Sequence, residues 1–388
     1  MSNSSTMLTT RKRILVLSLA YYPLVGGAEI AIKEITDRIR DIDFDMITMR
    51  FDKSHLKFEA IDNVHVHRIG WGGNYINKIL FVPLAALKAW RLNRKNHYRK
   101  FWAMMTYMLF PISIMRLFGN TTPYALTLQD GDPFEHVFRR SHIRVFAPLL
   151  RKGIREAEVV QTISNFLADW AKKFGYMKKV EVIPNGVDVD KFQNQESRIR
   201  NQDKTILITT SRLVKKNGVG DVIDALRLLP ENISFKILGT GPLMSELKMK
   251  VKSLNLKSRV NFLGYIPQSE IPNYLHKADI FIRPSLSEGM GSSFVEAMAA
   301  GLPVIATPVG GIPDFLFDPD RNKNHHSTGL FVNIHDSKDI ARQVARLIKD
   351  SKLRETLINN GRRLVREKYD WNLIAGEMKS KVFNNGKF

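Results

Sequence analysis

Short apolar runs alternate with amphipathic stretches along the first half of the chain. Residues 14–20 form a continuous apolar run, which is typical of a strand buried on both faces of a parallel sheet. A glycine-bearing turn, 21–27, follows, and residues 28–40 then place isoleucines at helical spacing. The pattern therefore predicts a strand, a glycine loop and a helix, in that order. Further strands are predicted at 44–50, 64–70, 124–130, 158–164 and 180–188.

The second half repeats this alternation after a polar stretch, 191–204, that is typical of a linker. Two series of strands alternating with helices predict an α/β fold of two facing Rossmann-like, doubly wound domains. The expected division is an N-terminal domain at 1–190, the linker, a C-terminal domain at 205–365 and a terminal segment at 366–388. The strands of the second series are predicted at 205–213, 234–242, 259–266, 279–285 and 303–307.

The glycine-bearing turns of this pattern follow the carboxyl ends of predicted strands. Ligands of doubly wound sheets bind at those ends of the strands. Two facing domains also create a concave space between them, which is the usual place for a ligand. We therefore expect the functional site in the cleft between the domains.

The composition is that of a soluble globular protein of 388 residues, with 44% hydrophobic and 25% charged residues. This length is too great for one ordinary core and agrees with two domains. The chain contains no cysteine, which excludes a disulfide framework, a thiol nucleophile and a thiolate metal site, and fits a reducing cytosol. The basic and apolar start, RKRILVLSLAYY, resembles a signal peptide, but its short apolar run leads directly into a glycine turn, so a first strand explains it better.

The net charge of +21 is unevenly spread, because the chain has no acidic residue between Asp62 and Asp130. This window contains two apolar stretches, 79–90 and 101–115, and neither reaches the roughly 20 residues of a membrane-spanning helix. Basic, aromatic amphipathic segments favour binding to an anionic membrane surface, with two core helices bearing solvated basic faces as the alternative. Nucleic acid is not expected as a partner, because no nucleic-acid-binding motif accompanies the charge. The basic residues of the window are Arg68, Lys78, Lys88, Arg91, Arg94, Lys95, Arg99, Lys100 and Arg116.

Two predicted loops carry groups suited to phosphate. Gly26 and Gly27 lie between the first strand and the first helix, where glycine lets backbone N–H groups approach an anion. They do not form a GxGxxG motif, which argues against a nicotinamide dehydrogenase. Arg212 and Lys216, within SRLVKKNG at 211–218, follow another strand, and a guanidinium and an ammonium on one loop suit a diphosphate. A plain tight turn and a solvated basic turn are the alternatives.

The stretch SEGMGSSFVEAMAAGLPVIATPVGG, 287–311, places Glu288 and Glu296 eight residues apart around a glycine turn. Glu288 precedes the Gly-Met-Gly sequence 289–291 at a strand-to-helix junction, where backbone N–H groups and the helix dipole favour anions. A carboxylate beside such a site is expected if the ligand combines phosphate with hydroxyls, because a carboxylate can accept hydrogen bonds from both hydroxyls of a diol. For Glu296 the alternative is a capping box with Ser293.

This stretch resembles the E-x7-E signature of the retaining, nucleotide-sugar-dependent glycosyltransferases of the GT-B fold, glycosyltransferase family 4. The resemblance covers nearly the whole chain, and the stretch 287–311 is its most specific part. In that family the C-terminal helix crosses back onto the first domain, which is expected here for residues 371–382. The other segments that carry the resemblance are Gly26-Gly27-Ala28-Glu29, TISNF (162–166), IPNGVD (183–188), SRLVKKNG (211–218), LGTGP (238–242) and FLGYIP (262–267).

The resemblance implies a role for each part of the donor site. It assigns Glu288 to the hydroxyls of the donor sugar and Glu296 to the nucleotide ribose. Arg212 and Lys216 would hold the diphosphate, although the common spacing of the family puts the lysine at the position of Asn217. The glycine loop would close over the phosphates, and backbone N–H groups would complete the cradle. The expected donor-binding residues are Gly26, Gly27, Arg212, Lys216, Glu288, Gly289, Met290, Gly291, Ser292 and Glu296.

The same resemblance implies front-face attack with retention of configuration, the leaving phosphate taking the proton of the acceptor. Family members often carry a histidine near the acceptor, and Asp132, in TLQDGDP, is the candidate at that place. The expected catalytic residues are Glu288, Arg212, Lys216 and Asp132. No metal and no separate cofactor are expected, because the two cations can neutralise the diphosphate. Short Asp-x-Asp patterns, which arise by chance, begin at Asp43, Asp188 and Asp318.

The expected function is transfer of a hexose from a nucleotide diphosphate sugar to a glycan or a polyprenyl- or lipid-linked acceptor. The product would be a cell-surface polysaccharide or glycolipid, and the enzyme would be cytoplasmic, bound peripherally to the inner face of the plasma membrane. One alternative is a non-catalytic nucleotide- or glycan-binding partner of an active homologue, which the presence of both glutamates and both cations disfavours. The other is a sugar-nucleotide epimerase of the same fold, which would release isomerised sugar without an acceptor.

Overall fold

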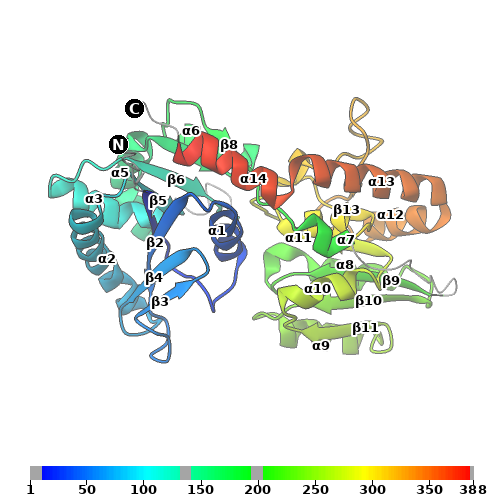
Figure 1. Cartoon of the computed structure of the whole chain (residues 1–388). Helices are drawn as coiled ribbons and strands as arrows, with labels where there is room; N and C mark the ends of the chain where they lie inside the picture. The colour runs from blue at the N-terminus through cyan, green and yellow to red at the C-terminus, as the bar shows by residue number, and fades with distance from the viewer. Residues whose placement is uncertain (1–10, 132–140, 194–203, 385–388) are drawn as a thin grey trace, which may run out of the picture.

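The computed structural model describes residues 11–131, 141–193 and 204–384, which form two α/β domains side by side (Figure 1). The eight-stranded N-terminal sheet has the order β3-β4-β2-β1-β5-β6-β7-β8, in which β3 pairs antiparallel with β4 and the other neighbours pair in parallel. Its strands are β1 (Lys12–Leu17), β2 (Ile42–Met49), β3 (Phe58–Ile61), β4 (Val64–Ile69), β5 (Lys100–Met104), β6 (Tyr124–Leu128), β7 (Val159–Thr162) and β8 (Glu181–Val182).

Helices cover both faces of this sheet because its central strands are apolar on both sides. Ile14 and Val16 of β1 face one layer of the core, whereas Leu15 and Leu17 face the other. The first layer contains α1, and the second contains the helices that follow β4, β5, β6 and β7. The helices of this domain are α1 (Gly27–Arg38), α2 (Tyr75–Asn96), α3 (Leu109–Leu117), α5 (Ser141–Glu156) and α6 (Asn165–Lys173).

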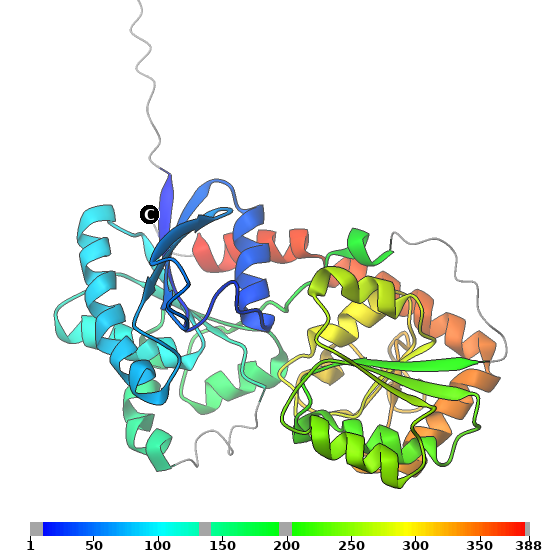
Figure 2. The same ribbon diagram turned by 90° about the horizontal axis from the view of Figure 1, so that it is seen from below.

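The C-terminal domain has a parallel six-stranded sheet in the order β11-β10-β9-β12-β13-β14. The predicted fold class is thus confirmed: two doubly wound α/β domains face each other, as Figure 2 also shows. The strands are β9 (Thr205–Thr210), β10 (Ile233–Leu238), β11 (Val260–Gly264), β12 (Ile280–Arg283), β13 (Val304–Ala306) and β14 (Leu330–Phe331). The helices are α8 (Val219–Leu226), α9 (Met244–Ser253), α10 (Ile271–Leu275), α11 (Ser292–Ala299), α12 (Ser337–Lys349) and α13 (Ser351–Lys368).

The chain passes between the domains twice, and the two passages lie side by side. The first leads through Val187 into α7 (Val189–Gln193), which spans the boundary expected at 190. On the way back, the N–H of Val187 donates to Tyr369 O at 2.7 Å. The last helix, α14 (Trp371–Glu377), then lies against α1 of the N-terminal domain (Figure 1). A short π-helical turn, Met378–Phe383, ends the described chain on the same domain.

The end of the chain is fixed by aromatic packing and by a buried lysine. The ring of Phe383 makes edge contacts with Trp102 and Phe44, with centroids 5.0 and 5.7 Å away. Lys100 Nζ donates to Val382 O at 2.7 Å and forms an ion pair with Glu158 at 3.3 Å. Burial lowers the pKa of Lys100, because the charged form loses its hydration.

The prediction that residues 101–115 lie on a membrane surface is wrong. Residues 101–104 belong to β5, which lies between β1 and β6 in the middle of the sheet, and the Trp102 side chain is completely buried. The apolar run lies in a strand covered on both faces, and an indole is accommodated there because Trp102 Nε1 donates to Thr127 Oγ1 at 2.8 Å. Three of the basic residues also serve the protein interior rather than a surface. Arg68 pairs with Glu59, Lys100 holds the chain end, and Arg116 donates to the carbonyl oxygens of Asn120 and Thr122.

Replacing Phe383 with alanine should destabilise the protein, because the cavity would open between β2, β5 and the C-terminal turn. We expect a loss of about 3 kcal/mol in the free energy of unfolding, as for other buried phenylalanines. Urea unfolding followed by circular dichroism would measure it. Phe118→Ala is the matched control, because Phe118 is 78% exposed and its loss should cost less than about 0.5 kcal/mol. Equal stability of the two variants would contradict the packing described here.

Candidate active site

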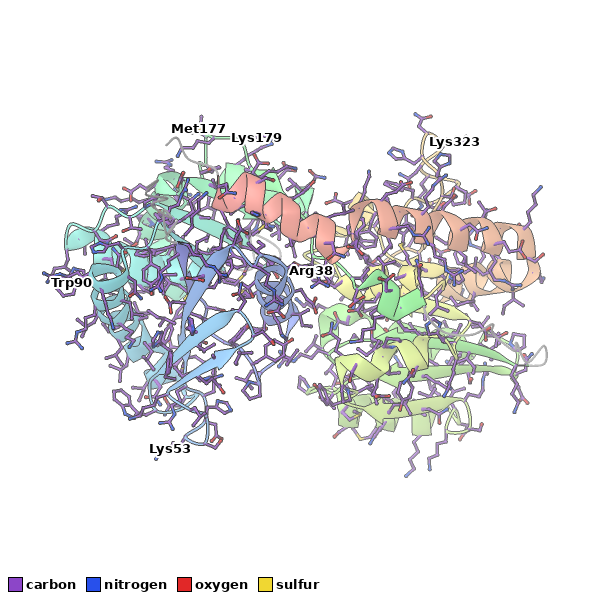
Figure 3. The ribbon with its side chains drawn as sticks, in the orientation of Figure 1. Arg38, Lys53, Trp90, Met177, Lys179 and Lys323 are labelled. Carbon is purple, nitrogen blue, oxygen red and sulfur yellow. The ribbon has the colours of Figure 1, made fainter. Side chains whose placement is uncertain are left out.

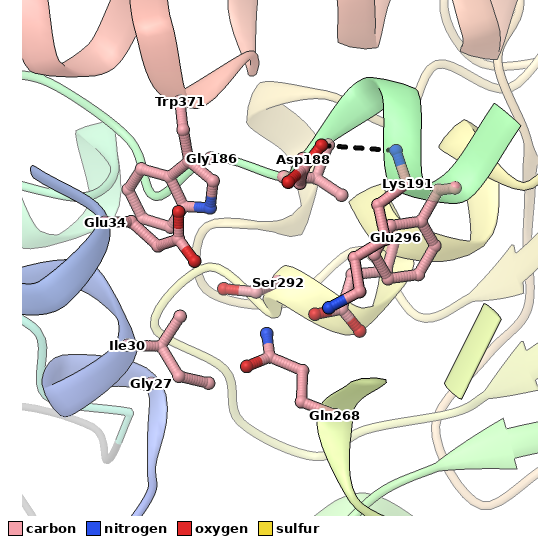
Figure 4. A pocket seen from close by; sticks show the side chains of 12 residues that line it. Gly27, Ile30, Glu34, Gly186, Asp188, Lys191, Gln268, Ser292, Glu296 and Trp371 are labelled. Atoms are coloured by element: carbon pink, nitrogen blue, oxygen red, sulfur yellow. Dashed lines mark hydrogen bonds between the residues drawn. The ribbon is translucent and has the colours of Figure 1, made fainter. Parts of the chain in front are cut away.

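A pocket opens between the two domains at the carboxyl ends of their sheets. It contains about 490 Å³ of empty space, part of it open to solvent. Figure 4 shows Ile30 and Glu34 of α1 facing Gln268, Ser292 and Glu296 of the C-terminal domain. The two chain passages between the domains close a third side. The pocket is lined by Gly27, Ile30, Glu34, Gly186, Val187, Asp188, Lys191, Phe192, Gln268, Ser292, Glu296 and Trp371.

Glu288 lies in the loop between β12 and α11, and both its backbone and its side chain are fixed. The N–H of Gly311 donates to Glu288 O at 3.2 Å. Gly310 has a positive φ of 57°, and a Cβ there would lie 1.7 Å from the same oxygen, so this position requires glycine. The carboxylate Oε2 accepts a hydrogen bond from Arg283 Nη2 at 2.9 Å. The second glycine pair of the signature therefore holds the loop that presents Glu288.

Glu296 lies on the second turn of α11 with its carboxyl group buried in the pocket wall. Burial raises the pKa of Glu296 to about 7, although the guanidinium of Arg283, a hydrogen bond from Gln268 and the ammonium of Lys191 each lower it. The alternative that Glu296 forms a capping box with Ser293 is wrong. The Ser293 hydroxyl instead accepts a hydrogen bond from Arg283 Nη1 at 2.7 Å, and α11 begins without a side-chain cap. The Glu296 side chain is thus directed into the pocket and does not accept a hydrogen bond from the backbone at the start of α11.

The loop after β9 carries both predicted phosphate cations. Arg212 is exposed, and its side chain makes no hydrogen bond or ion pair with the described residues. Lys216 reaches the opposite wall of the cleft, where a Cβ on Gly131 would lie 3.0 Å from its Nζ. Asn217, at the lysine spacing of the family, is buried, and its Nδ2 donates to Arg212 O at 2.6 Å. The local fold therefore directs Lys216 into the cleft and uses Asn217 to close the loop.

The start of α11 offers backbone donors on the same side of the cleft. Among the described residues, the N–H groups of Met290, Gly291 and Ser292 have no acceptor. Such groups at a helix N-terminus, with the helix dipole behind them, favour an anion. The Met290 side chain turns away from this turn, and its Sδ lies 3.3 Å from the N of Asn185 in the other domain.

The N-terminal glycine loop faces the pocket through Gly27. Gly26 is the N-cap of α1, and a Cβ there would lie 2.7 Å from Glu29 Oε2. Burial raises the pKa of Glu29. The carboxylate of Glu29 therefore lies against the glycine loop that the sequence assigns to phosphate.

The loop after β6 forms the N-terminal wall beside Glu288. The Ser287 hydroxyl donates to Gly131 O at 2.7 Å across the cleft, and a Cβ on Gly289 would lie 2.5 Å from Asp130 O. The amides of Gln129 and Asn185 pair with each other at 3.2 and 3.3 Å. The predicted acceptor-side residue Asp132 lies outside the described residues.

Comparison with known proteins identifies both domains. Residues 25–191 match the family described as Glycosyltransferase Family 4, and residues 190–364 match the family described as Glycosyl transferases group 1. The structure of Anabaena HepE in complex with UDP-glucose superposes with a TM-score of 0.78, 22% identity and coverage of 96% of this chain and 99% of that chain. The chain belongs to the GT-B glycosyltransferases.

Two relatives of this glycosyltransferase carry specific names. The N-acetyl-alpha-D-glucosaminyl L-malate synthase of Bacillus anthracis is 26% identical over 92% of this chain and 93% of its own length. The GDP-mannose-dependent alpha-(1-6)-phosphatidylinositol monomannoside mannosyltransferase of Mycobacterium tuberculosis is 28% identical over 61% of this chain and 65% of its own length. These relatives act on different substrates according to their names, so the family alone does not define the substrate of this glycosyltransferase.

Reasoning from the sequence did not find three polar residues of the cleft of this glycosyltransferase. Arg283 contacts Glu288, Gln268 contacts Glu296, and Asn185 links the N-terminal wall to Met290. A signal existed for Arg283, because it is a charged residue inside an apolar strand directly before the signature. Asn185 lies within IPNGVD, 183–188, one of the segments that carry the resemblance, but no role was predicted for it. Gln268 carries no such signal, because amides are common in exposed loops.

Replacing Glu296 with glutamine should alter how the stability of this glycosyltransferase depends on pH. The pKa of a glutamate is about 4.3 in an unfolded chain but about 7 for Glu296 in the folded protein. A folded-state pKa that is raised gives a contribution that is complete below the unfolded value and is lost as the pH rises through about 7. Relative to wild type, Glu296→Gln should therefore gain on the order of 3 kcal/mol in the free energy of unfolding between about pH 4 and pH 8.

Urea unfolding at several pH values would measure this difference. Glu246→Gln is the control, because Glu246 is exposed on α9 of the same domain. A stability difference for Glu296→Gln that stays constant across this pH range would contradict the burial of an unfavourable charge at this position.

Proposed function

We propose that this glycosyltransferase moves a hexose from a nucleotide diphosphate sugar to a glycan or lipid-linked acceptor, with retention of configuration, in the synthesis of a cell-surface polysaccharide or glycolipid. One observation carries the proposal: the loop that bears a guanidinium and an ammonium is bonded to the loop that bears the fixed carboxylate and leads into a helix N-terminus, through Leu286 N and Lys216 O at 2.6 Å. These groups belong to Arg212, Lys216, α11 and Glu288. A diphosphate requires the first three, and a hydroxylated sugar requires the fourth.

The arrangement suits the charge that develops when the glycosidic bond to phosphate breaks. Arg212 has no side-chain partner among the described residues, so its donors are available to the diphosphate. Each charge-assisted hydrogen bond contributes about 1.5–3 kcal/mol. Two such bonds, aimed at the leaving group, would lower the barrier by several powers of ten. Glu288 would accept hydrogen bonds from the sugar, and Glu296 from the ribose.

The same groups support transfer with retention and without a metal. In front-face attack the leaving phosphate takes the proton of the acceptor hydroxyl, so no side-chain base is needed. The charge on the diphosphate is balanced by the side chains of Arg212 and Lys216. Among the described residues, no three His, Asp or Glu side chains cluster in a way that could hold a metal ion. We infer a metal-independent reaction because the two cations can neutralise the diphosphate.

The names of similar proteins support the class of donor and of acceptor. The Anabaena HepE structure contains UDP-glucose, and the mycobacterial relative is named as GDP-mannose-dependent. That relative is also named for phosphatidylinositol monomannoside, a lipid-linked sugar. We therefore infer a nucleotide hexose as donor and a membrane lipid or a growing glycan as acceptor.

Single substitutions of Glu288 and of Arg212 by alanine should distinguish the residue that binds the sugar from the residue that binds the diphosphate. Glu288→Ala should lower kcat/KM for the nucleotide sugar by about 100-fold or more, because bonds to the sugar hydroxyls are lost, and should leave the affinity for free nucleoside diphosphate within about threefold. Arg212→Ala should lower both kcat/KM for the nucleotide sugar and the affinity for free nucleoside diphosphate. Donor hydrolysis and transfer would be measured with UDP-, GDP- and ADP-hexoses chosen by thermal shift, and NMR of the product would show its anomeric configuration.

Glu246→Ala and Arg227→Ala are the matched controls, because Glu246 is exposed on α9 and Arg227 is exposed directly after α8 of the same domain. Normal turnover by Glu288→Ala would contradict the proposal. An inverted product would contradict retention, and release of an isomerised sugar without acceptor would indicate an epimerase.

We also propose that the enzyme binds an anionic membrane through α2, at the inner face of the plasma membrane. No described helix is both long and apolar enough to cross a bilayer. Helix α2 nevertheless exposes an apolar stripe at helical spacing, with 71% of Tyr75 and 66% of Ile76 accessible. Trp90 projects from the same helix on the outer side of its domain (Figure 3), beneath the guanidinium of Arg94 at 4.8 Å. The stripe consists of Tyr75, Ile76, Ile79, Leu80 and Leu87.

Basic residues accompany this stripe. Arg91, Arg94 and Lys95 are exposed near the end of α2, and Lys78 and Lys88 are half-buried along it. Each basic residue near an anionic surface contributes about 1 kcal/mol to binding. Together these residues would bind the membrane about as strongly as a single acyl anchor.

Sedimentation with vesicles of phosphatidylglycerol and phosphatidylcholine would test the membrane proposal. Ile76→Ser with Ile79→Ser should weaken binding by about tenfold or more, because each isoleucine loses about 1–2 kcal/mol of burial in the lipid interface. Binding of the wild type should also weaken as salt is raised. Met249→Ser is the control, because Met249 is 66% exposed on the C-terminal domain. Binding that is absent, or that does not depend on salt, would contradict the proposal.

A further inference from the structure

The last residue of β12, Arg283, is a buried cation between the two glutamates of the signature. Only 7% of its side chain is exposed. Its Nη2 donates to Glu288 Oε2 at 2.9 Å, and its Nη1 donates to Ser293 Oγ at 2.7 Å and to Thr210 O at 3.1 Å. The guanidinium stacks on the ring of Phe294 at 4.2 Å. Residues of β9, β12, the signature loop and α11 thus fix its position.

We propose that Arg283 is a positioning residue, which fixes the carboxylate of Glu288 in the orientation that binds the donor sugar. The inference rests on the proposed function and adds to it the residue through which Glu288 is held. By occupying Oε2, Arg283 fixes the rotation of the carboxylate and leaves Oε1 for sugar hydroxyls. It acts through Glu288 and does not itself touch the substrate.

Comparison with Arg259, a half-buried arginine of the same domain, supports a role for Arg283 beyond packing. Arg259 directs its Nε and Nη2 at the carbonyl oxygens of Ile233, Leu229 and Pro230, as expected of an arginine that only joins segments of backbone. Arg283 instead directs its Nη2 at a signature carboxylate, and its Nε has no acceptor among the described residues. A leucine at this position of β12 could pack on Phe294 without a buried charge, so packing alone does not require arginine.

The same guanidinium also acts on Glu296. Its positive charge favours the ionised form of Glu296 and so opposes the effect of burial. The other charged groups that face Glu296 are Lys191 from α7 and, across the pocket, Asp188 and Glu34. Loss of Arg283 would leave Lys191 as the remaining cation near Glu296 among the described lining residues. A change at Arg283 should therefore be visible in the pH dependence of nucleotide binding, which a residue that only packs would not alter.

Kinetics of Arg283→Leu, Arg283→Lys and Arg283→Leu/Glu288→Ala would test this inference. Arg283→Leu should lower kcat/KM for the nucleotide sugar by about 10- to 100-fold, the effect of one charge-assisted hydrogen bond. The affinity for free nucleoside diphosphate should stay within about threefold near pH 9, where Glu296 is ionised, and the pH midpoint of that binding should move upward by about one unit. Arg283→Lys should restore part of the activity.

The double variant decides whether Arg283 acts through Glu288. In a Glu288→Ala background, Arg283→Leu should cause no further loss of kcat/KM, because the carboxylate that Arg283 holds is absent. A further loss equal to that in the wild type would overturn the inference, as would normal kinetics of Arg283→Leu. Arg259→Leu is the control for a purely structural loss. It should lower the free energy of unfolding, but the protein that remains folded should keep its kcat/KM and its pH midpoint of nucleotide binding. If Glu288→Ala alone is fully active, the proposed function fails instead.

Discussion

On the proposed function, a diphosphate has to bind close to the carboxylates of Glu288 and Glu296, and the repulsion between these negative charges is the main constraint on the residues around them. At separations of a few ångströms in a partly desolvated site, each like-charge pair costs several kcal/mol. The structure supplies compensating charge in three forms: the exposed side chain of Arg212 and the half-buried one of Lys216, backbone donors at the start of α11, and a buried guanidinium at Arg283. Each lies at the carboxyl end of a strand or at a helix start, because those are the places where a doubly wound fold leaves groups unpaired.

The cleft is also held by direct contact between the domains, and these contacts touch the donor loops themselves. Ser287 donates to Gly131 O beside Glu288, and Asn185 meets Met290. Further along, the carboxylate of Asp314 accepts the first N–H of α6 at 2.7 Å, so a residue of the C-terminal domain caps a helix of the other. Opening the cleft would break these bonds together. A ligand that fills the cleft would therefore be coupled to the relative position of the two domains.

The sequence predicted the parts of this structure that depend on local pattern. Alternation of strands and helices was sufficient for the fold class, since buried parallel strands and amphipathic helices differ in period. Residues 101–104 were misassigned because a continuous apolar run is compatible with both a central strand and a buried helix, and the sheet neighbours that decide between them are distant in sequence. Arg283 was missed for a related reason: its partners Glu288, Ser293 and Thr210 meet only after β9 and β12 have paired.

On the proposed function, membrane contact and catalysis would place separate demands on one domain. Helix α2 and the loop after β6 are both attached to the N-terminal sheet, so a membrane-bound α2 would fix the orientation of the wall formed by Gln129, Asp130 and Gly131. The C-terminal domain is joined to that sheet by the two passages at Val187 and Tyr369 and by α14. It could therefore carry the donor toward a stationary, membrane-held acceptor wall. Domain closure would then deliver the sugar to the lipid, without the bound domain having to leave the surface.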